Sequence, residues 1–122
     1  MSAKILVVED DLYLRELYAE ILKKEGYDVD TAADGEEGYN KVVKGGWDLV
    51  LMDIVLPKMN GLDILRKAST ESAAKTNKSV VFLTNLDNAD QMKEALLLGD
   101  AYLIKSQVTP GNLIDEIKKY IK

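Results

Sequence analysis

Short, continuous apolar runs alternate along the chain with longer segments in which apolar residues recur at helical spacing. The runs predict five strands, at residues 4–8, 29–32, 49–53, 80–84 and 101–104. The segments that follow them predict five helices. The first has apolar residues at helical spacing, Leu14, Leu17, Tyr18, Ile21 and Leu22, and the fourth bears Met92, Ala95 and Leu96. The inner faces of the second, third and fifth carry Tyr39, Val42 and Val43, then Ile64 and Leu65, and last Leu113, Ile114, Ile117 and Ile121. The polar stretch 69–79 is expected to be a frayed helix end and a loop.

Capping and stop residues mark the ends of these predicted helices. Gly26, Gly45-Gly46 and Gly99 end three of them, because glycine readily adopts the backbone that terminates a helix. Asp34 and the residues 85–88 supply N-cap candidates, and Thr109-Pro110 gives an N-cap followed by proline at the first helical position.

The strict alternation of strands and helices predicts the fold class. Near-continuous apolar strands indicate a parallel sheet covered by helices on both faces, with right-handed crossovers. We therefore expect an α/β, flavodoxin-like (βα)5 fold, doubly wound, with five parallel strands in the order 2-1-3-4-5. Residues 1–122 should form a single domain, and we expect no attached output domain because no linker or low-complexity tract is visible.

Composition narrows the chemistry. The chain has no cysteine and no histidine, which excludes thiol catalysis, histidine general bases and most transition-metal sites, and leaves carboxylates, hydroxyls and lysine. The net charge of −5 makes non-specific binding to nucleic acid or anionic membrane a weak hypothesis. No apolar run approaches the roughly 20 residues that span a bilayer, so we expect a cytoplasmic protein without membrane insertion.

Acidic residues follow two of the predicted buried strands directly. Glu9, Asp10 and Asp11 end the first strand, and Asp53 ends the third. Moving an ionised carboxylate out of water costs on the order of several kcal/mol, unless the carboxylate is paired with a cation or coordinated to a metal. Since neighbouring parallel strands open at the same sheet edge, these acids should converge on a hard cation. Two or three carboxylates with a backbone carbonyl and water suit Mg²⁺.

Two further groups stand at the ends of the fourth and fifth predicted strands. The Thr84 hydroxyl can donate a hydrogen bond to a phosphoryl oxygen, and the Lys105 ammonium can pair with another. Asp53 is then available as a nucleophile, and carboxylate attack on phosphorus gives an acyl phosphate.

With these groups in place, the sequence resembles the receiver domains of two-component response regulators, similar to the chemotaxis-type single-domain regulators. The resemblance spans essentially the whole chain and is carried by VVEDD at 7–11, DIVLPKMNG at 53–61, FLT at 82–84 and YLIK at 102–105. It implies that Asp53 accepts a phosphoryl group from the phosphohistidine of a sensor histidine kinase or a histidine phosphotransfer protein. The chain would then be a signalling switch with only weak self-phosphorylation and autodephosphorylation activity.

The resemblance also implies residue roles. Mg²⁺, with Mn²⁺ as an alternative, would be held by Asp10, Asp53 and the backbone carbonyl of Val55, with Glu9 acting through water. On phosphorylation, Thr84 would move toward the phosphoryl group and Tyr102 would turn inward behind it. The surface formed by the fourth helix, fifth strand and fifth helix would then change its preference for a downstream protein target. We expect a monomer or a weak dimer that does not bind nucleic acid directly.

Two departures from the family pattern stand out. Ser106 follows Lys105 where the family usually has a proline, often after a cis peptide bond. A cis bond before serine costs about 2.5 to 4 kcal/mol, so we expect either a cis bond held by its surroundings or a trans bond with a differently shaped loop. Val55 and Leu86 are apolar at positions that, in the family, influence the water that attacks the phosphoryl group. Neither side chain can orient water by hydrogen bonding, which predicts a long-lived phosphorylated form.

Other interpretations compete with this one. Taken singly, Asp10 or Asp11 could be a helix N-cap, Asp53 a turn residue and Lys105 a solvated charge. A nucleotide or flavin binder is disfavoured because the acids after the first strand would repel phosphate without a metal. A metal-dependent phosphatase would usually carry a general acid at position 55, which is valine. A receiver-shaped interaction module that works without phosphorylation would be expected to lack an acid, the hydroxyl or the lysine.

Overall fold

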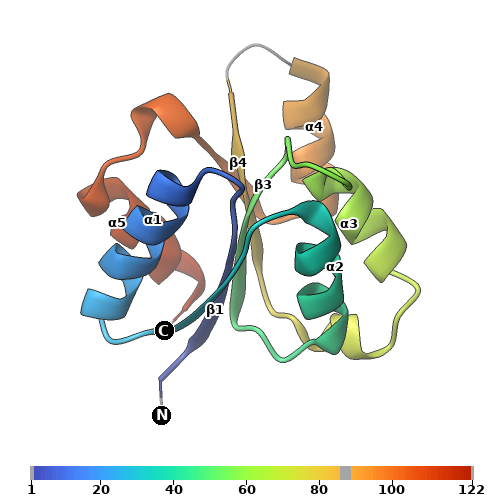
Figure 1. Cartoon of the computed structure of the whole chain (residues 1–122), viewed down its shortest axis with the longest axis horizontal. Helices are drawn as coiled ribbons and strands as arrows, with labels where there is room; N and C mark the ends of the chain where they lie inside the picture. Colours follow the sequence, from blue (N-terminus) through green and yellow to red (C-terminus); the bar gives the residue numbers. More distant parts are fainter. Residues whose placement is uncertain (1, 86–88, 122) are drawn as a thin grey trace.

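The computed structural model describes residues 2–85 and 89–121, and these form one parallel sheet between two layers of helices (Figure 1). The strands are β1 (Lys4–Val8), β2 (Asp28–Ala32), β3 (Leu49–Asp53), β4 (Val80–Thr84) and β5 (Ala101–Ile104). Their order is β2-β1-β3-β4-β5, and all neighbouring pairs are parallel. The predicted flavodoxin-like fold class and strand order are confirmed.

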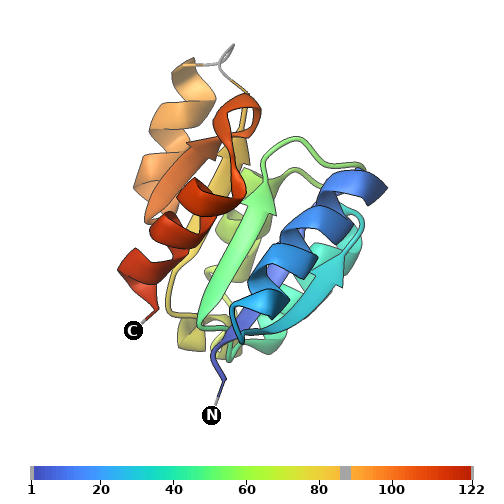
Figure 2. The same ribbon diagram turned by 90° about the vertical axis from the view of Figure 1, so that its left-hand side faces the viewer.

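The helices cover both faces of the sheet, as Figures 1 and 2 show. They are α1 (Leu12–Lys24), α2 (Gly35–Lys44), α3 (Gly61–Ala68), α4 (Ala89–Leu98) and α5 (Pro110–Tyr120), with short 3₁₀ turns η1 (Ala73–Thr76) and η2 (Lys105–Gln107). Helices α1 and α5 lie on one face, and α2, α3 and α4 on the other. Within the described residues, none of these helices has the length and apolar character needed to cross a membrane.

Alternate residues of each strand point into different helix layers. Leu6, Met52 and Phe82 belong to the cluster under α2, α3 and α4, whereas Ile5 and Leu51 belong to the cluster under α1 and α5. All of these side chains are fully buried. Burial on both faces explains why the strand segments are continuously apolar instead of alternating with polar residues. It also leaves the carboxyl ends of the strands as the place where polar side chains can gather.

The predicted N-caps form where the structure describes them. Asp11 caps α1 by accepting a hydrogen bond from the Leu14 N–H at 2.9 Å, and Asp34 caps α2 in the same way. Thr109 caps α5, with Pro110 at its first position. Of the cap candidates proposed for α4, residues 86–88 lie outside the described residues. The Asp11 side chain therefore serves as the N-cap of α1, and the carboxylates of Glu9 and Asp10 are not used in capping that helix.

Gly35 marks a close approach between α2 and the β3–α3 loop. Its N–H donates to the Pro57 carbonyl at 2.9 Å, and a Cβ atom at this position would lie 1.8 Å from the Met59 carbonyl oxygen. Gly35→Ala must therefore displace the loop, and we expect a loss of about 1–3 kcal/mol in the free energy of unfolding, as for other overpacked sites. Gly111→Ala is the matched control, because a Cβ at this position would meet nothing within 4 Å. Within a helix this change should raise the free energy of unfolding by roughly 0.5–1 kcal/mol. Urea denaturation of both variants checks the two opposite signs, and equal effects would contradict the steric argument.

Candidate functional site

The acidic residues at the ends of β1 and β3 converge as expected. The two strands are neighbours in the sheet, with Val8 in register with Met52, so their carboxyl ends open side by side. Glu9, Asp10 and Asp53 each offer a carboxylate oxygen, and these oxygens lie within 4.8 Å of one another. Asp10 is exposed, whereas Glu9 and Asp53 are buried. The three side chains form an acidic cluster that is open to solvent on the Asp10 side.

Glu9 is the most confined member of the acidic cluster. Its side chain is fully buried, and its Oε1 accepts a hydrogen bond from the Asp11 N–H at 3.2 Å. Burial, reinforced by the negative charge of Asp53, raises the pKa of Glu9 to about 7 despite the opposing effect of Lys105. Its Oε2 atom is buried and makes no hydrogen bond within the described part of the chain, although Lys105 Nζ lies 3.2 Å from it as an ion-pair partner. A carboxylate in this position is poised to interact with an additional cation or donor.

Lys105 spans the two buried acids. Its Nζ lies 2.7 Å from Asp53 Oδ2 and 3.2 Å from Glu9. Burial disfavours the charged ammonium, yet the hydrogen bond and charge of Asp53, together with Glu9, raise the pKa of Lys105 above its ordinary value. The described residues contain no cis peptide bond, so the Lys105–Ser106 bond is trans and the chain continues as the η2 turn. Of the two peptide geometries expected before Ser106, the trans bond is the one observed.

Asp53 is held by its own loop. It is 4% exposed, and its Oδ1 accepts a hydrogen bond from the Val55 N–H at 3.2 Å. The loop then returns to the strand end, where the Gly61 N–H donates to the Ile54 carbonyl at 2.8 Å. A Cβ on Gly61 would lie 2.4 Å from the Asp53 carbonyl oxygen, so this return requires glycine. The Val55 side chain is 61% exposed beside the acidic cluster.

The remaining predicted residues lie at or near the same sheet edge. Thr84 is buried at the end of β4, and its hydroxyl donates to the Asn85 carbonyl at 3.1 Å. Tyr102 is half-buried on β5, in register with Phe82, and packs against the cluster under α2, α3 and α4. It lies two residues before the strand end, away from the acids. Leu86 lies outside the described residues.

Sequence reasoning missed one residue that contacts the acidic turn. The Arg15 guanidinium donates from Nη1 to the carbonyl oxygens of Glu9, at 2.9 Å, and Asp10, at 3.3 Å. The available signal was a basic residue one turn inside a helix that follows three acids. That signal is weak, because a basic residue in such a position usually pairs with carboxylates on the helix surface.

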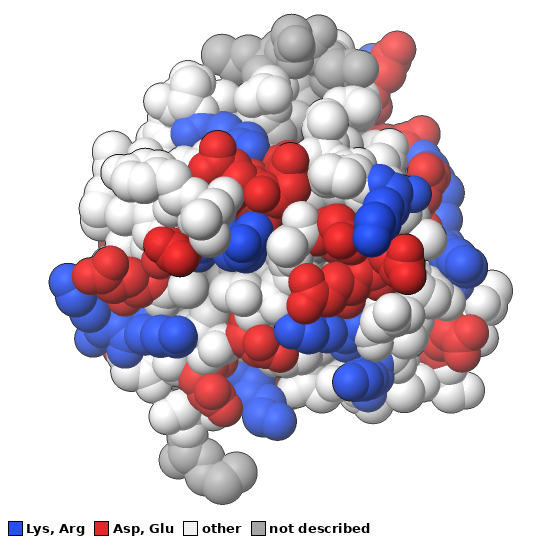
Figure 3. Space-filling view, in the orientation of Figure 1, with Lys and Arg blue, Asp and Glu red and all other residues white. Residues whose placement is uncertain are grey.

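Charges on the visible face of the molecule are mixed. Figure 3 shows Lys and Arg side chains interspersed with Asp and Glu instead of gathered in one basic patch. The absence of direct nucleic-acid binding stays a prediction.

The fold and these side chains define a doubly wound α/β protein with an acidic cluster and a bridging lysine at the carboxyl edge of its sheet. The family model for the response regulator receiver domain matches residues 5–118. The chemotaxis protein CheY of Treponema pallidum is 35% identical over 98% of this chain and 83% of its own length. The sporulation initiation phosphotransferase F of Bacillus subtilis is 32% identical over 99% of this chain and 95% of its own.

Solved structures agree with this match. Vibrio cholerae chemotaxis protein CheY4 superposes with a TM-score of 0.87 at 27% identity, covering 99% of this chain and 100% of that one. The chain spans 45% to 55% of the length of three transcriptional regulators that it also matches. The chain belongs to the response regulator receiver domain family of two-component signalling, and Glu9, Asp10 and Asp53 form its acidic cation-site cluster.

Proposed function

We propose that this receiver domain accepts a phosphoryl group on Asp53 from the phosphohistidine of a sensor histidine kinase or a histidine phosphotransfer protein. The reaction depends on Mg²⁺, with Mn²⁺ as an alternative, and the phosphorylated form signals through protein contacts. The observation that carries the proposal is the Lys105 ammonium 2.7 Å from a nearly buried Asp53 carboxylate, beside two further acids. This arrangement joins a nucleophile, a cation for phosphoryl oxygens and ligands for a metal.

The residues fit a hard divalent cation. All donors in the acidic cluster are carboxylate oxygens, which Mg²⁺ prefers, and three of them lie within 4.8 Å of one another. Asp10, Asp53 and the Val55 carbonyl would hold the ion, with Glu9 acting through water. When bound, Mg²⁺ supplies positive charge that offsets the charge of the phosphoryl oxygens.

The transfer itself needs little more than positioning. An Asp53 oxygen forms a bond to phosphorus as the P–N bond of the donor's phosphohistidine breaks, and the leaving imidazole nitrogen keeps the electron pair and takes a proton from water. Lys105 pairs with one phosphoryl oxygen, and the Thr84 hydroxyl turns from the Asn85 carbonyl to donate to another. Later hydrolysis of the acyl phosphate restores the Asp53 carboxylate. Weak self-phosphorylation and autodephosphorylation would thus turn a signalling switch on and off.

Signalling would use the surface formed by α4, β5 and α5. A groove of about 290 Å³ on this side is lined by Tyr102, Ile104, Val108 and neighbouring residues of α5. Movement of Thr84 toward the phosphoryl group would leave room for Tyr102 to turn inward, which changes this groove and the target that it fits. A cytoplasmic location and a monomeric or weakly dimeric state are part of the same proposal.

Intact-mass analysis tests the assignment of Asp53. Incubation with a small phosphodonor and Mg²⁺ should add one phosphoryl group to the wild type and none to Asp53→Asn. Asp28→Asn is the matched control, because this exposed aspartate lies at the opposite end of the sheet, and it should react as the wild type does. Failure of the wild type to gain mass would instead favour an interaction module that works without phosphorylation. Equal uptake by Asp53→Asn would reject Asp53 as the acceptor.

The lifetime of the phosphoryl group is a second test. Because exposed Val55 offers attacking water no hydrogen bond, we expect slow loss of phosphate in Mg²⁺ buffer and a several-fold faster loss from Val55→Asn. Mass spectra taken over time would measure both rates. Leu97→Asn, a polar change at an exposed position of α4, should leave the rate unchanged. Rapid loss from the wild type would contradict the expectation.

A further inference from the structure

The turn between β1 and α1 carries two residues of the acidic cluster but has few backbone hydrogen bonds of its own. Asp11 begins the helix by accepting the Arg15 N–H at its carbonyl, at 2.9 Å. The carbonyls of Glu9 and Asp10 precede that point and have no helical donor. Among the described residues, the donor that they share is the Arg15 guanidinium, through Nη1.

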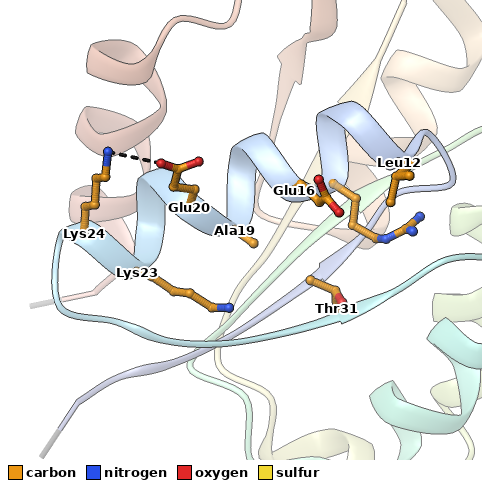
Figure 4. A pocket seen from close by; sticks show the side chains of 8 residues that line it. Leu12, Glu16, Ala19, Glu20, Lys23, Lys24 and Thr31 are labelled. Carbon is orange, nitrogen blue, oxygen red and sulfur yellow. Dashed lines mark ion pairs between the residues drawn. The ribbon is translucent and has the colours of Figure 1, made fainter.

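The guanidinium of Arg15 bonds backbone carbonyls and not carboxylates. Acids are close in sequence on both sides of it, yet no ion pair joins Arg15 to a carboxylate within residues 2–85 and 89–121. Its side chain is half-buried at the groove between α1 and β2, which Leu12, Glu16 and Thr31 also line (Figure 4). The guanidinium therefore reaches the turn from the helix side through the turn's backbone, while the Glu9 carboxylate pairs with Lys105 and the Asp11 N–H.

We infer that Arg15 is a positioning residue for cation binding, which holds the Glu9–Asp10 turn so that the Asp10 carboxylate points into the acidic cluster. One nitrogen that bonds two consecutive carbonyls fixes the peptide units around Asp10. Glu9 has a second anchor, because its buried side chain contacts Lys105 and the Asp11 N–H. Asp10 is exposed, and residues 2–85 and 89–121 give its side chain no such anchor, so the bond to its carbonyl matters most for its direction. This inference rests on the proposed cation site.

Positioning and charge predict opposite effects on Mg²⁺ binding when Arg15 is removed. Removing a positive charge near an acidic cluster should strengthen binding of a divalent cation if Arg15 acts only through its charge. If Arg15 acts by positioning, its loss should weaken binding, as the loss of groups that orient metal ligands does, typically 10–100-fold. We expect about a tenfold increase in the Kd for Mg²⁺ in Arg15→Met, because only one ligand loses its anchor.

Calorimetric titration with MgCl₂ tests this on the whole chain. Arg66→Met is the matched control, because Arg66 pairs with Asp63 and Glu94 on α3 and α4, and it should bind Mg²⁺ as the wild type does. Tighter or unchanged binding by Arg15→Met would overturn the inference. A wild type that binds no Mg²⁺ would reject the proposed cation site itself, so the two failures are distinguishable.

A double-mutant cycle separates positioning from general damage to the fold. If Arg15 acts through Asp10, the methionine change should have little effect on Mg²⁺ binding once Asp10 is asparagine. A full tenfold effect in the Asp10→Asn background would overturn the inference. Should Arg15→Met not fold, Arg15→Lys serves in the same cycle: its ammonium keeps the charge but lacks the planar fork, and we expect a smaller loss of affinity that again disappears with Asp10→Asn.

Discussion

Glu9→Gln is expected to abolish a loss of stability, roughly 2–3 kcal/mol, that the metal-free wild type undergoes between pH 5 and pH 8, although it removes an ion-pair partner of Lys105. Burial and the charge of Asp53 raise the pKa of Glu9 from 4.5 to about 7. The unfolded chain releases this proton near pH 4.5 and the folded chain near 7, so between these values the unfolded state binds fewer protons. Stability therefore falls as pH rises through this window, and glutamine should abolish that fall.

Urea denaturation followed by circular dichroism at pH 5 and pH 8, with a chelator present, measures the effect. The wild type should lose stability between these two values relative to Glu9→Gln. Glu71→Gln, at an exposed position after α3, is the control and should follow the wild type. Parallel pH profiles of stability for the wild type and Glu9→Gln would show that Glu9 is not the group whose raised pKa lowers the stability at high pH. Saturating Mg²⁺ should narrow the difference, because a cation stabilises the ionised carboxylates.

Lys105→Met is expected to slow phosphoryl uptake by about 100-fold or more, which is the usual cost of losing a fixed donor to developing negative charge. Lys105 is the cation that contacts Asp53, at 2.7 Å, and the methionine side chain fills similar space without charge or donor. Binding of Mg²⁺ should strengthen in the same variant, because the ammonium competes for the carboxylates. Slower chemistry together with tighter metal binding is the distinctive result.

Timed intact-mass spectra measure uptake, and calorimetry measures Mg²⁺ binding. Lys78→Met is the matched control, since Lys78 pairs with Asp48 at the opposite end of the sheet. It should match the wild type in both measurements. If Lys105→Met gains the phosphoryl group at the wild-type rate, the role given to the lysine is wrong, whatever happens to metal binding.

Most of the fold could be predicted because strand burial and helix capping are local signals. The apolar runs gave four strands with their observed bounds, and β2 begins one residue earlier, at Asp28, since this polar residue pairs with Lys4 in the sheet. Backbone pairing of that kind leaves no mark in an apolar pattern. The η1 turn within the polar stretch and the exposure of Leu96 depend on tertiary packing in the same way.

The sequence predicts which residues lie at the candidate site, but it does not predict which of them are buried or how they pair. Strand ends identify Glu9, Asp10, Asp53, Thr84 and Lys105 as neighbours once the sheet order is known. Which acid is buried depends on the path of the turn after β1, and so does the choice of Asp11 as the helix cap. The reach of Lys105 after a trans bond to Ser106 depends on the η2 turn. Arg15 was missed because its bonds go to backbone atoms, which carry no residue-specific signal.

The strand order also bears on how copies of the chain meet. Since β2 borders the sheet, it is a position where a strand of another molecule could add, yet the Thr31 N–H donates to Asp30 Oδ1 at 2.8 Å and the Thr31 carbonyl accepts from Lys41 Nζ at 2.6 Å. Its outward positions carry Asp28 and Asp30, both exposed, and Lys41 of α2 pairs with Asp30 beside that rim. An incoming copy of β2 would bring its own aspartates against these. We expect this rim to resist strand addition at neutral pH, and crowded solutions to remain clear of fibrous aggregates that grow through it.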